Sequence, residues 1–158
     1  MSSKPWHVYV LRNATNTKIY TGATNDPARR LKAHRGGTRA GGAKTTARWK
    51  GGEHNIHMCM LISGFSSQGK ALRFERMFKR KKVRGLSGVR GRMAALHRMS
   101  KHTDVHRLTL WCELDAAEYF REPEKERARN TFLARCSSHL FNCGVDIIAR
   151  AHDGDAEE

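Results

Sequence analysis

Acidic residues are scarce in the first 110 positions of this 158-residue chain. That stretch holds 24 Lys and Arg but only four Asp and Glu, whereas residues 111–158 hold six basic and 11 acidic residues. The overall formal charge is +15, and such an excess favours a polyanionic partner, most often nucleic acid, or a generally adhesive basic protein. The acidic remainder could pack as an extension, form a partner surface or partly mimic the charge of DNA.

Cysteines with metal-ligand spacing and long apolar runs are also missing. The four cysteines include no CxxC pair, so we expect neither a zinc site built from them alone nor a disulfide framework. No signal peptide and no apolar run of membrane length is apparent. We therefore expect an intracellular, reducing compartment and no membrane partner. The basic run at 79–82 fits either a nuclear signal or a solvated helix end that touches phosphate.

Three short segments have the composition of β-strands. Residues 6–11 (WHVYVL) are aromatic and β-branched, and residues 18–22 (KIYTG) follow them after a turn-rich stretch. Residues 55–65 (NIHMCMLISGF) are more uniformly apolar, as expected of a buried strand. The first two segments predict an antiparallel hairpin. On the assumed register Tyr9 lies opposite Tyr20, so that both hydroxyls emerge on one face.

A helix is predicted directly after the second strand. Asp26 can cap its free amides, and Pro27 is tolerated at the first helical position. Arg30 and His34 stand four residues apart and therefore share one face of this helix. Gly22, just before it, is interpreted as the residue that lets the backbone turn. The helix should end at the glycine pair that follows His34.

A later helix, predicted for about residues 68–82, carries an acidic residue on its apolar side. At the helical period Glu75 falls within an apolar arc made of Ala71, Leu72, Phe74, Met77 and Phe78. A lone buried charge is costly, so this carboxylate needs a partner. The partner could be an arginine in a structural salt bridge or a metal ion in a cleft, and composition does not choose between them.

The remaining segments are interpreted from their composition. Residues 36–53 are rich in Gly, Thr, Lys and Arg and predict a mobile basic loop that could follow a nucleic-acid backbone. A glycine-containing loop at 85–91 is expected to lead into a helix at 92–101. Residues 107–114 fit a short strand or the start of an extended segment, and the stretch after Pro123 fits a helix with i, i+4 charge pairs.

Together these elements predict an α+β fold. A small central three-stranded antiparallel sheet is flanked by helices, and a mainly helical extension follows at the C-terminus. We divide the chain into a sheet-containing domain at 1–83, a basic helical segment at 84–106 and an acidic C-terminal extension at 107–158.

An ordered set of residues in the first domain resembles the GIY-YIG nuclease superfamily. The set consists of Tyr9 in VYVL, Tyr20 and Gly22 in IYTG, Arg30 ten residues after Tyr20, and Glu75 on a later helix. The first signature reads HVY where the family has Gly-Ile-Tyr, and the second reads YTG where it has Tyr-Ile-Gly. Each signature is weak alone, but the ordered set with its spacing is specific.

Within the superfamily, the chain most resembles the structure-selective branch, which includes the catalytic subunit of the eukaryotic repair nuclease that cuts flaps and Holliday junctions. The stretches YTGATNDPARRLKAHRGG, GGAKTTAR and ISGFSSQGKALRFE carry this likeness. The cellular enzymes have a zinc module at the C-terminus, and this chain has no matching cysteine and histidine pattern there. A minimal, divergent or viral version is therefore expected, in the nucleus or another DNA-containing compartment.

The resemblance implies a role for each site residue. Glu75 would hold one divalent ion, Mg²⁺ or Mn²⁺, which commonly keeps water and phosphate oxygens as further ligands. Tyr9 would deprotonate or position the attacking water, and Tyr20 would orient the nucleophile or the phosphate. Arg30 would grip the scissile phosphate and offset charge in the transition state. His34 would act as an acid or base, since its unperturbed pKa is near neutral. Taken one at a time, these residues also fit structural roles.

The implied function is a metal-dependent endonuclease for branched DNA (flaps, forks and Holliday junctions), in repair or recombination. The alternatives are a catalytically retired nucleic-acid-binding module on the same fold, or a homing or other GIY-YIG endonuclease. A second copy of the chain or a scaffold protein could bind through the C-terminal extension. The residues expected to contact DNA are basic and cluster on the first helix, the basic loop and the later helix: Arg29, Lys32, Arg35, Arg39, Lys44, Arg48, Arg73 and Arg76.

Overall fold

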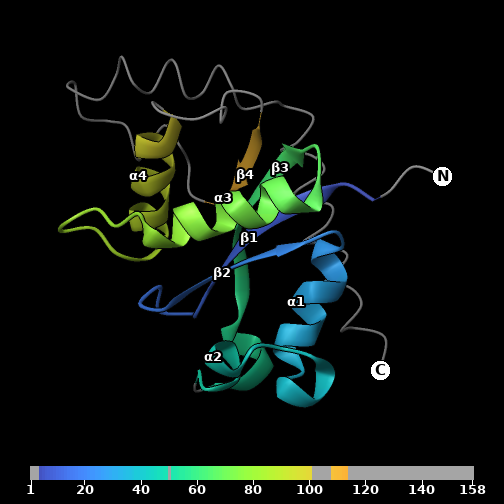
Figure 1. The fold of residues 1–158 in the computed structure, drawn as a ribbon. Helices are drawn as coiled ribbons and strands as arrows, with labels where there is room; N and C mark the ends of the chain where they lie inside the picture. Colours follow the sequence, from blue (N-terminus) through green and yellow to red (C-terminus); the bar gives the residue numbers. More distant parts are fainter. Residues whose placement is uncertain (1–3, 50, 101–107, 114–158) are drawn as a thin grey trace.

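The computed structural model describes residues 4–49, 51–100 and 108–113. Figure 1 shows α3 lying across the strands with α4 beside its C-terminal end, and α1 and α2 on the side away from α4. In chain order the elements are β1 (Trp6–Arg12), β2 (Ile19–Thr24), α1 (Pro27–Arg35), η1 (Thr38–Ala40), α2 (Lys44–Ala47), η2 (Gly52–Asn55), β3 (His57–Phe65), α3 (Gln68–Arg80), α4 (Gly88–Ser100) and β4 (Thr109–Cys112).

The sheet is antiparallel, in the order β2-β1-β3-β4. This confirms the predicted α+β class, but the sheet has four strands where three were expected. The fourth strand, β4, pairs with β3 so that Cys112 lies opposite Met60 and Trp111 opposite Leu61. A four-residue strand is too short to show a clear alternation in the sequence, and its pairing with β3 is what makes it a strand.

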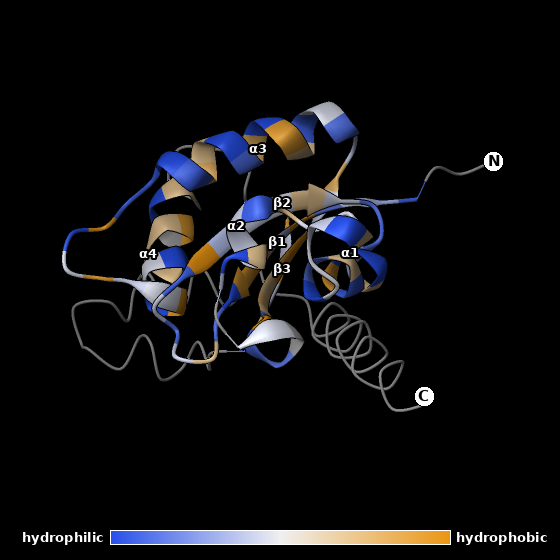
Figure 2. Ribbon diagram, turned by 90° about the horizontal axis from the view of Figure 1, so that it is seen from below, coloured by the Kyte–Doolittle hydropathy of each residue, from blue (hydrophilic) through white to orange (hydrophobic). Residues whose placement is uncertain are grey.

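The two faces of the sheet bury different sets of side chains. Val8 and Val10 point into a core with residues of α3 and α4, including Phe74 and Met93. On the opposite face, a second core contains Tyr9, Leu11, Leu31, Trp49, Ile56, Met58, Leu61 and Trp111. The hydropathy colouring in Figure 2 shows polar residues on the outer side of α3 and apolar strands beneath it. The sheet thus separates the α3–α4 layer from α1 and the 36–56 segment.

The register of the first hairpin differs from the assumed one. Tyr9 pairs with Gly22, and Tyr20 pairs with Leu11. The two tyrosines still share a face because Tyr9 and Leu11 are two residues apart. Tyr20 is therefore a diagonal neighbour of Tyr9, with 6.3 Å between the ring centroids. The predicted common face is correct, but the directly opposed pairing is wrong.

The helix starts follow the capping residues that the sequence offers. Asp26 accepts a hydrogen bond from the Arg29 amide over 3.1 Å, and α1 begins at Pro27 as predicted. Ser67 caps α3 by accepting from the Lys70 amide. The predicted loop at 36–53 instead contains η1, α2 and the first half of η2. It is not only a surface loop, because the side chains of Thr46 and Trp49 are buried there.

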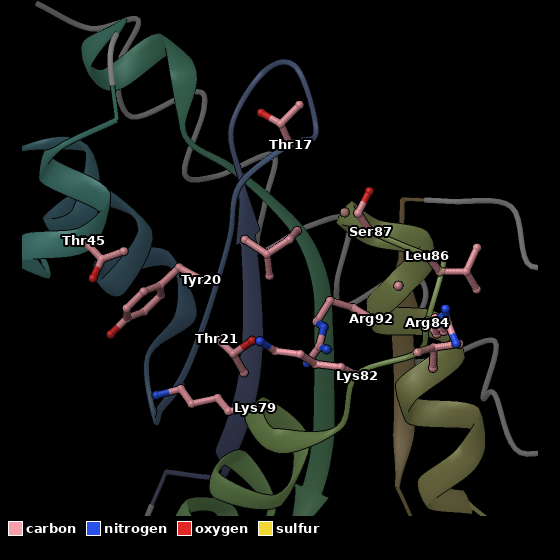
Figure 3. Close-up of a pocket in the computed structure, with 14 residues that line it drawn as sticks. Thr17, Tyr20, Thr21, Thr45, Lys79, Lys82, Arg84, Leu86, Ser87 and Arg92 are labelled. Carbon is pink, nitrogen blue, oxygen red and sulfur yellow. The ribbon is translucent and has the colours of Figure 1, made fainter.

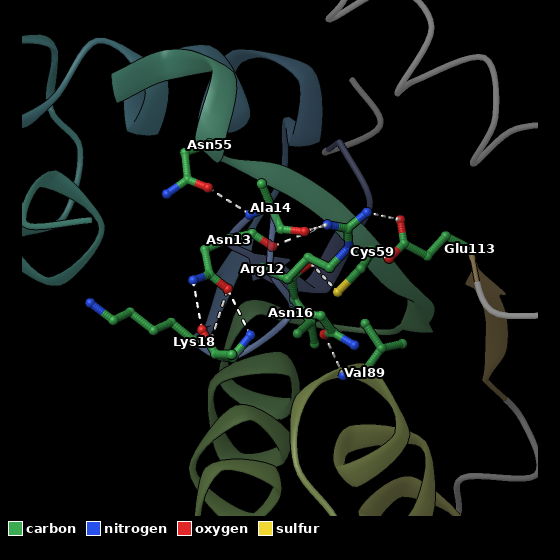
Figure 4. A network of polar contacts seen from close by, with 11 residues as sticks. Arg12, Asn13, Ala14, Asn16, Lys18, Asn55, Cys59, Val89 and Glu113 are labelled. Carbon is green, nitrogen blue, oxygen red and sulfur yellow. Dashed lines mark hydrogen bonds and ion pairs between the residues drawn. The ribbon is translucent and has the colours of Figure 1, made fainter. Parts of the chain in front are cut away.

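The turn between β1 and β2 ties several distant elements together (Figure 4). Its Asn13 side chain accepts hydrogen bonds from the Thr17 and Lys18 amides, each over 2.9 Å. Asn16 has a left-handed backbone, with φ of 55°, and its Oδ1 accepts from the Val89 amide over 3.0 Å. This contact caps α4 from outside, so α4 begins at Gly88 and includes residues that were expected to be loop.

Some sequence predictions concern residues beyond this described part. The helix after Pro123 and most of the acidic extension at 107–158 lie outside the described residues, as do Cys136 and Cys143. Cys59 and Cys112 are buried and form no disulfide. Across the described ranges, no helix has the length and apolar character needed to cross a membrane. The predicted boundaries after residues 83 and 106 stay predictions, although α4 and β4 share a core with the first domain.

Candidate active site

The hydroxyl of Tyr9 is the centre of a cluster of polar side chains. Tyr9 lies in β1 and is fully buried. Arg30 Nε donates a hydrogen bond to Tyr9 Oη over 3.1 Å, and His34 Nε2 lies 2.8 Å from the same oxygen. Arg30 and His34 are one turn apart on α1, so this helix brings both side chains to a single atom.

Gly22 makes the room that the Tyr9 ring occupies. A Cβ atom at Gly22 would lie 2.4 Å from Tyr9 Oη and 2.6 Å from Cζ, far inside contact distance. Gly22 belongs to β2 and faces Tyr9 across the ladder. The interpretation of Gly22 as a turn residue is therefore wrong. A side chain is excluded here because the phenol crosses over the strand, not because the backbone bends.

The buried side chain of Thr46 forms a hydrogen bond with the Nδ1 nitrogen of His34, on the side of the imidazole away from Tyr9. Thr46 Oγ1 lies 2.8 Å from His34 Nδ1 and 3.1 Å from the Ala43 carbonyl oxygen, to which it donates its hydroxyl proton. The threonine oxygen then accepts from Nδ1, which leaves Nε2 free to accept the proton of Tyr9. The Ala43 amide is 3.5 Å from Nδ1, too long to compete with the shorter contact.

His34 is neutral at physiological pH. Burial, together with the positive charge of Arg30, lowers its pKa from 6.5 to about 4. The unperturbed value that suggested an acid or base role therefore does not apply in the folded protein. A neutral imidazole whose Nδ1 carries the proton can accept a proton from Tyr9, but it cannot donate one from Nε2.

Tyr9 keeps its phenolic proton in the resting site. Burial raises its pKa, while the hydrogen bond and charge of Arg30 lower it. The neighbouring Tyr20 and Glu75 raise the pKa further through their charges. The phenol therefore needs an acceptor if it is to lose its proton, and His34 is the base in contact with it.

Tyr20, which lies in β2, packs its ring against Tyr9 and His34. Its ring centroid lies 4.9 Å from that of His34, and its side chain is half-buried. The pKa of Arg30 is raised: burial opposes the rise, but hydrogen bonding and charge from Tyr9 and Tyr20 outweigh it. Both tyrosines thus stabilise the Arg30 guanidinium in its charged form, as an anionic phosphate group requires.

Glu75 approaches this cluster from α3, on the other face of the sheet. Its side chain is only 14% exposed, and its Oε1 lies 2.5 Å from Lys79 Nζ, one helical turn further on. The charge of Glu75 also contributes to the raised pKa of Tyr9. The inward carboxylate does have a protein partner, but this partner is a lysine and not one of the arginines considered from the sequence.

Two hollows border residues of the tyrosine cluster. The larger, of about 950 Å³, lies between the first hairpin and the α3–α4 connection (Figure 3). Tyr20 lines it together with Lys79, Lys82, Arg84 and Arg92. The smaller hollow is lined by Arg29, Arg30, Lys32, Ala33, Ala40 and Gly41. Basic side chains therefore line both hollows beside the cluster.

The predicted DNA contacts are placed unevenly around these hollows. Arg29 and Lys32 are exposed and line the smaller one. Arg35 is half-buried and donates hydrogen bonds to the Ile56 carbonyl through Nε and Nη2, which anchors the segment before β3. The other five are exposed and line neither hollow: Arg39, Lys44, Arg48, Arg73 and Arg76.

The donor set fits a divalent ion only if water and substrate complete its coordination. Within residues 4–49, 51–100 and 108–113, no group of three or more His, Cys, Asp or Glu residues could hold a metal. Glu75 supplies a single hard carboxylate, and its ion-pair partner Lys79 lines an open, basic hollow. Mg²⁺ accepts such a site because it keeps several waters and takes phosphate oxygens as ligands. The residues present therefore fit an ion of this kind.

The sequence of residues 5–86, which contains this whole cluster, matches the model of the GIY-YIG catalytic domain family. The match covers more than half of the chain and includes both strands and both helices that carry the cluster. The chain belongs to the GIY-YIG family. The resemblance inferred from the ordered tyrosines, arginine and glutamate is thereby confirmed.

Several curated proteins from fungi are similar to this chain. It is 41% identical over 69 residues to "Structure-specific endonuclease subunit SLX1" of Candida dubliniensis, covering 43% of this chain and 23% of that protein. It is 39% identical over 69 residues to the protein of the same name from Chaetomium globosum, covering 43% and 20%. It is 43% identical over 68 residues to the protein of the same name from Aspergillus niger, and the match covers 42% of this chain and 15% of that protein. The chain thus spans about a fifth of the length of these relatives.

Sequence reasoning missed two side chains of this GIY-YIG site. Thr46 was hidden in a stretch interpreted as a basic loop, and only its burial against His34 reveals a role. Lys79 was grouped with the basic run at 79–82, although its i, i+4 spacing from Glu75 was a usable signal. Its position over the Tyr20 ring could not be inferred, because that depends on how α3 crosses β2.

Proposed function

We propose that this chain is a metal-dependent endonuclease that hydrolyses phosphodiester bonds in branched DNA. The observation that carries the proposal is the phenol of Tyr9, which is held between Arg30 and neutral His34 within the field of Glu75. A core tyrosine would not need this set of partners. A hydroxyl placed between a cation and a base is instead suited to hand on a proton beside a phosphate.

In this proposal Tyr9 receives the proton of the attacking water and passes its own phenolic proton to His34. His34 Nε2 accepts that proton, and Thr46 keeps Nδ1 engaged so that Nε2 stays available. The relay requires His34 to be neutral at the start, which its lowered pKa provides. It also explains why a phenol with a raised pKa can still take part at neutral pH.

Arg30 and Tyr20 would hold the scissile phosphate. The Arg30 guanidinium is fixed by Tyr9 through Nε and by the Gly41 carbonyl through Nη1, over 2.8 Å, so its position is set before substrate binds. A preorganised cation stabilises the charge that develops on the phosphate oxygens. A divalent ion on Glu75 would supply Lewis-acid stabilisation of the phosphate and the leaving oxygen. Tyr20 and Lys79, the ion-pair partner of Glu75, line the larger hollow, where a strand could enter.

The choice of branched DNA rests on three observations. The first 110 residues carry 24 of the 30 Lys and Arg residues and only four acidic residues. Two separate hollows that border the cluster are lined by basic side chains, which suits two nucleic-acid arms that meet at the scissile phosphate. The matched relatives are named structure-specific endonuclease subunits. On this basis we extend the DNA contacts to Lys82 and Arg84, beyond those inferred from the sequence.

A retired nuclease that only binds nucleic acid is the second candidate. The basic surface alone would be sufficient for it. The Tyr9 cluster favours the enzyme, because binding phosphate requires neither a buried histidine relay nor a carboxylate near the phosphate. Homing or other sequence-reading endonucleases of the family form a third candidate, and Lys or Arg contacts to the DNA backbone would not supply base recognition.

One cleavage panel tests the proposed activity. Labelled flap, fork, four-way junction and linear duplex, all of shared sequence, are incubated with the full chain in Mg²⁺, in Mn²⁺ or in EDTA. We expect products from the branched DNAs only, and only with metal. A lack of product under every metal condition would favour the binding module. Equal cutting of many unrelated linear duplexes would contradict structure selectivity.

The larger hollow is tested separately with charge reversals. Lys82→Glu combined with Arg84→Glu should weaken binding of the fork more than binding of the duplex, measured by fluorescence anisotropy in a Glu75→Gln background. Arg90→Glu with Arg98→Glu is the matched control, since both residues are exposed on α4 and line neither hollow. Equal losses in the two double variants would mean that only total charge matters.

The word subunit in the names of the relatives suggests a protein partner. We propose that a scaffold protein or a second copy of the chain binds through the acidic segment after residue 113. The substrate would place the protein in the nucleus or another DNA-containing compartment. Analytical ultracentrifugation of the full chain, with and without DNA, would detect self-association.

A further inference from the structure

Lys79 has no role in the proposed relay, yet it lies inside the site. Its Nζ is 2.5 Å from Glu75 Oε1 and 5.7 Å from the centroid of the Tyr20 ring. Its side chain is 46% exposed and borders the larger hollow, whereas the Glu75 side chain is largely covered. The ammonium group therefore occupies the open side of the carboxylate, which is the side from which a solvated ion would arrive.

We propose that Lys79 is a built-in cation that holds Glu75 when no divalent ion is present and that a divalent ion must displace. The inference rests on the proposed function, because it takes Glu75 to be the metal ligand. Lys79 neutralises a carboxylate that would otherwise repel the phosphates of approaching DNA. It also competes with the metal for the same oxygen, so this chain binds metal more weakly than its carboxylate alone would.

The larger hollow can accommodate the side chain of Lys79 after its displacement from Glu75. The lysine stem is long and flexible, and the hollow beside it is open and lined by Lys82 and Arg84. On release from Glu75, the ammonium can turn toward a phosphate in that hollow. Metal and DNA then help each other to bind, because each takes up one member of the Glu75–Lys79 pair. Such coupling is reciprocal, so DNA should tighten metal binding by the same factor as metal tightens DNA binding.

The affinity of the full chain for Mn²⁺ tests this inference without any cleavage. Free Mn²⁺ is titrated by electron paramagnetic resonance against wild type, Lys79→Gln, Lys79→Arg, Lys82→Gln and Glu75→Gln. Loss of a partly exposed ion pair predicts that Lys79→Gln binds Mn²⁺ about threefold to tenfold more tightly than wild type. Lys79→Arg keeps a cation beside Glu75 and should stay near wild type.

Lys82→Gln is the matched control, because it removes the same charge from the same hollow without an ion pair to Glu75. It should change Mn²⁺ affinity far less than Lys79→Gln does. Equal effects of the two variants, or weaker Mn²⁺ binding by Lys79→Gln, would overturn the role of Lys79. If Glu75→Gln binds Mn²⁺ as well as wild type does, the metal site itself is misplaced, and the proposed function fails with it.

Discussion

At the scale of single residues, the site depends on one buried oxygen with several partners. Tyr9 Oη contacts Arg30 and His34, and Gly22 leaves the space in which the phenol lies. His34 in turn reaches Thr46. Removing one member leaves another buried polar group without its partner, so changes here should affect stability as well as chemistry.

Tyr9→Phe removes the hydroxyl while keeping the ring. We expect cleavage to fall by about a hundredfold or more, because the proposed proton relay is broken. The free energy of unfolding should fall by about 1–3 kcal/mol, since the neighbouring buried polar groups lose a hydrogen-bond partner. Single-turnover cleavage and urea unfolding measure the two effects. A wild-type cleavage rate in Tyr9→Phe would remove Tyr9 from the chemistry.

Gly22→Ala should disturb the same ring from across the ladder. The new methyl group would fall 2.4 Å from Tyr9 Oη, so the phenol must move, and we expect a loss of about 1–3 kcal/mol together with slower cleavage. Gly69→Ala on α3 is the control. A Cβ there would have only Ser67 Oγ near it, at 4.0 Å, and should leave both measurements unchanged or raise stability slightly. Equal behaviour of the two variants would contradict the packing described for Gly22.

The sequence pointed to most residues of the proposed site but not to all of their contacts. Tyr9, Tyr20, Arg30 and His34 were proposed from the resemblance to the GIY-YIG family, and α1 was predicted from Asp26 and Pro27. The relay through Thr46 could not be predicted, because it joins residues 34 and 46 across a segment without strand or helix periodicity. The His34 pKa likewise depends on burial, which a single sequence does not reveal.

At the scale of elements, the first hairpin positions α4 and thereby one wall of the larger hollow. Asn16 caps α4 through the Val89 amide, and a Cβ on Gly88 would lie 2.5 Å from Asn16 Oδ1. Gly88, Gly91 and Arg92 line the hollow, so the position of the helix start affects its shape. The start of α4 was misplaced from the sequence because Gly85, Gly88 and Gly91 favoured a loop, whereas this tertiary contact supports the helix start.

Two substitutions at Asn16 distinguish the stability that comes from its capping hydrogen bond from the stability that depends on its backbone conformation. Asn16→Gly keeps the left-handed φ of 55° but loses the cap, and we expect a loss of about 1 kcal/mol in unfolding free energy. Asn16→Ala should lose about 1 kcal/mol more, because alanine resists that conformation. Guanidinium unfolding measures both, and hydrogen exchange of α4 amides locates the effect. An Asn16→Gly variant as stable as wild type would show that α4 does not depend on this cap.

The element boundaries show where sequence patterns stop being informative. β1, β2, β3, α1 and α3 were predicted within a few residues. β4 was left open between strand and extended chain, since four residues carry too little pattern. Glu113 directly follows β4, and its carboxylate accepts hydrogen bonds from Arg12 in β1 (Figure 4). A truncation intended to remove the acidic segment should therefore end after residue 113 and not within β4.

At the scale of the whole molecule, the protein combines a strongly basic surface with buried neutral histidines. His34 keeps its neutral form because burial lowers its pKa, and burial also lowers the pKa of His7. Between pH 6.5 and about 4 the unfolded chain takes up a proton at His34 that the folded chain does not. Stability should therefore be fully present above pH 6.5 and decline as the pH falls through this window.

The contribution of His34 can be measured from the pH dependence of the unfolding free energy. We expect wild type to lose up to about 3 kcal/mol through this residue as the pH falls from 7 to 4. His34→Gln should be less stable at pH 7 but lose less on acidification. His7→Gln should remove a separate part of the slope. Urea unfolding at a series of pH values measures the slopes, and an unchanged slope in His34→Gln would contradict its neutral, buried state.

The most direct test of the proposed site is single-turnover cleavage of a labelled flap in Mg²⁺ by Glu75→Gln, with anisotropy to follow DNA binding. Glutamine keeps the shape of the side chain but removes the charge that a divalent ion requires. We predict that cleavage falls by about a thousandfold while DNA binds as well as to wild type, or slightly better. Wild-type cutting by Glu75→Gln would contradict the assignment of the site.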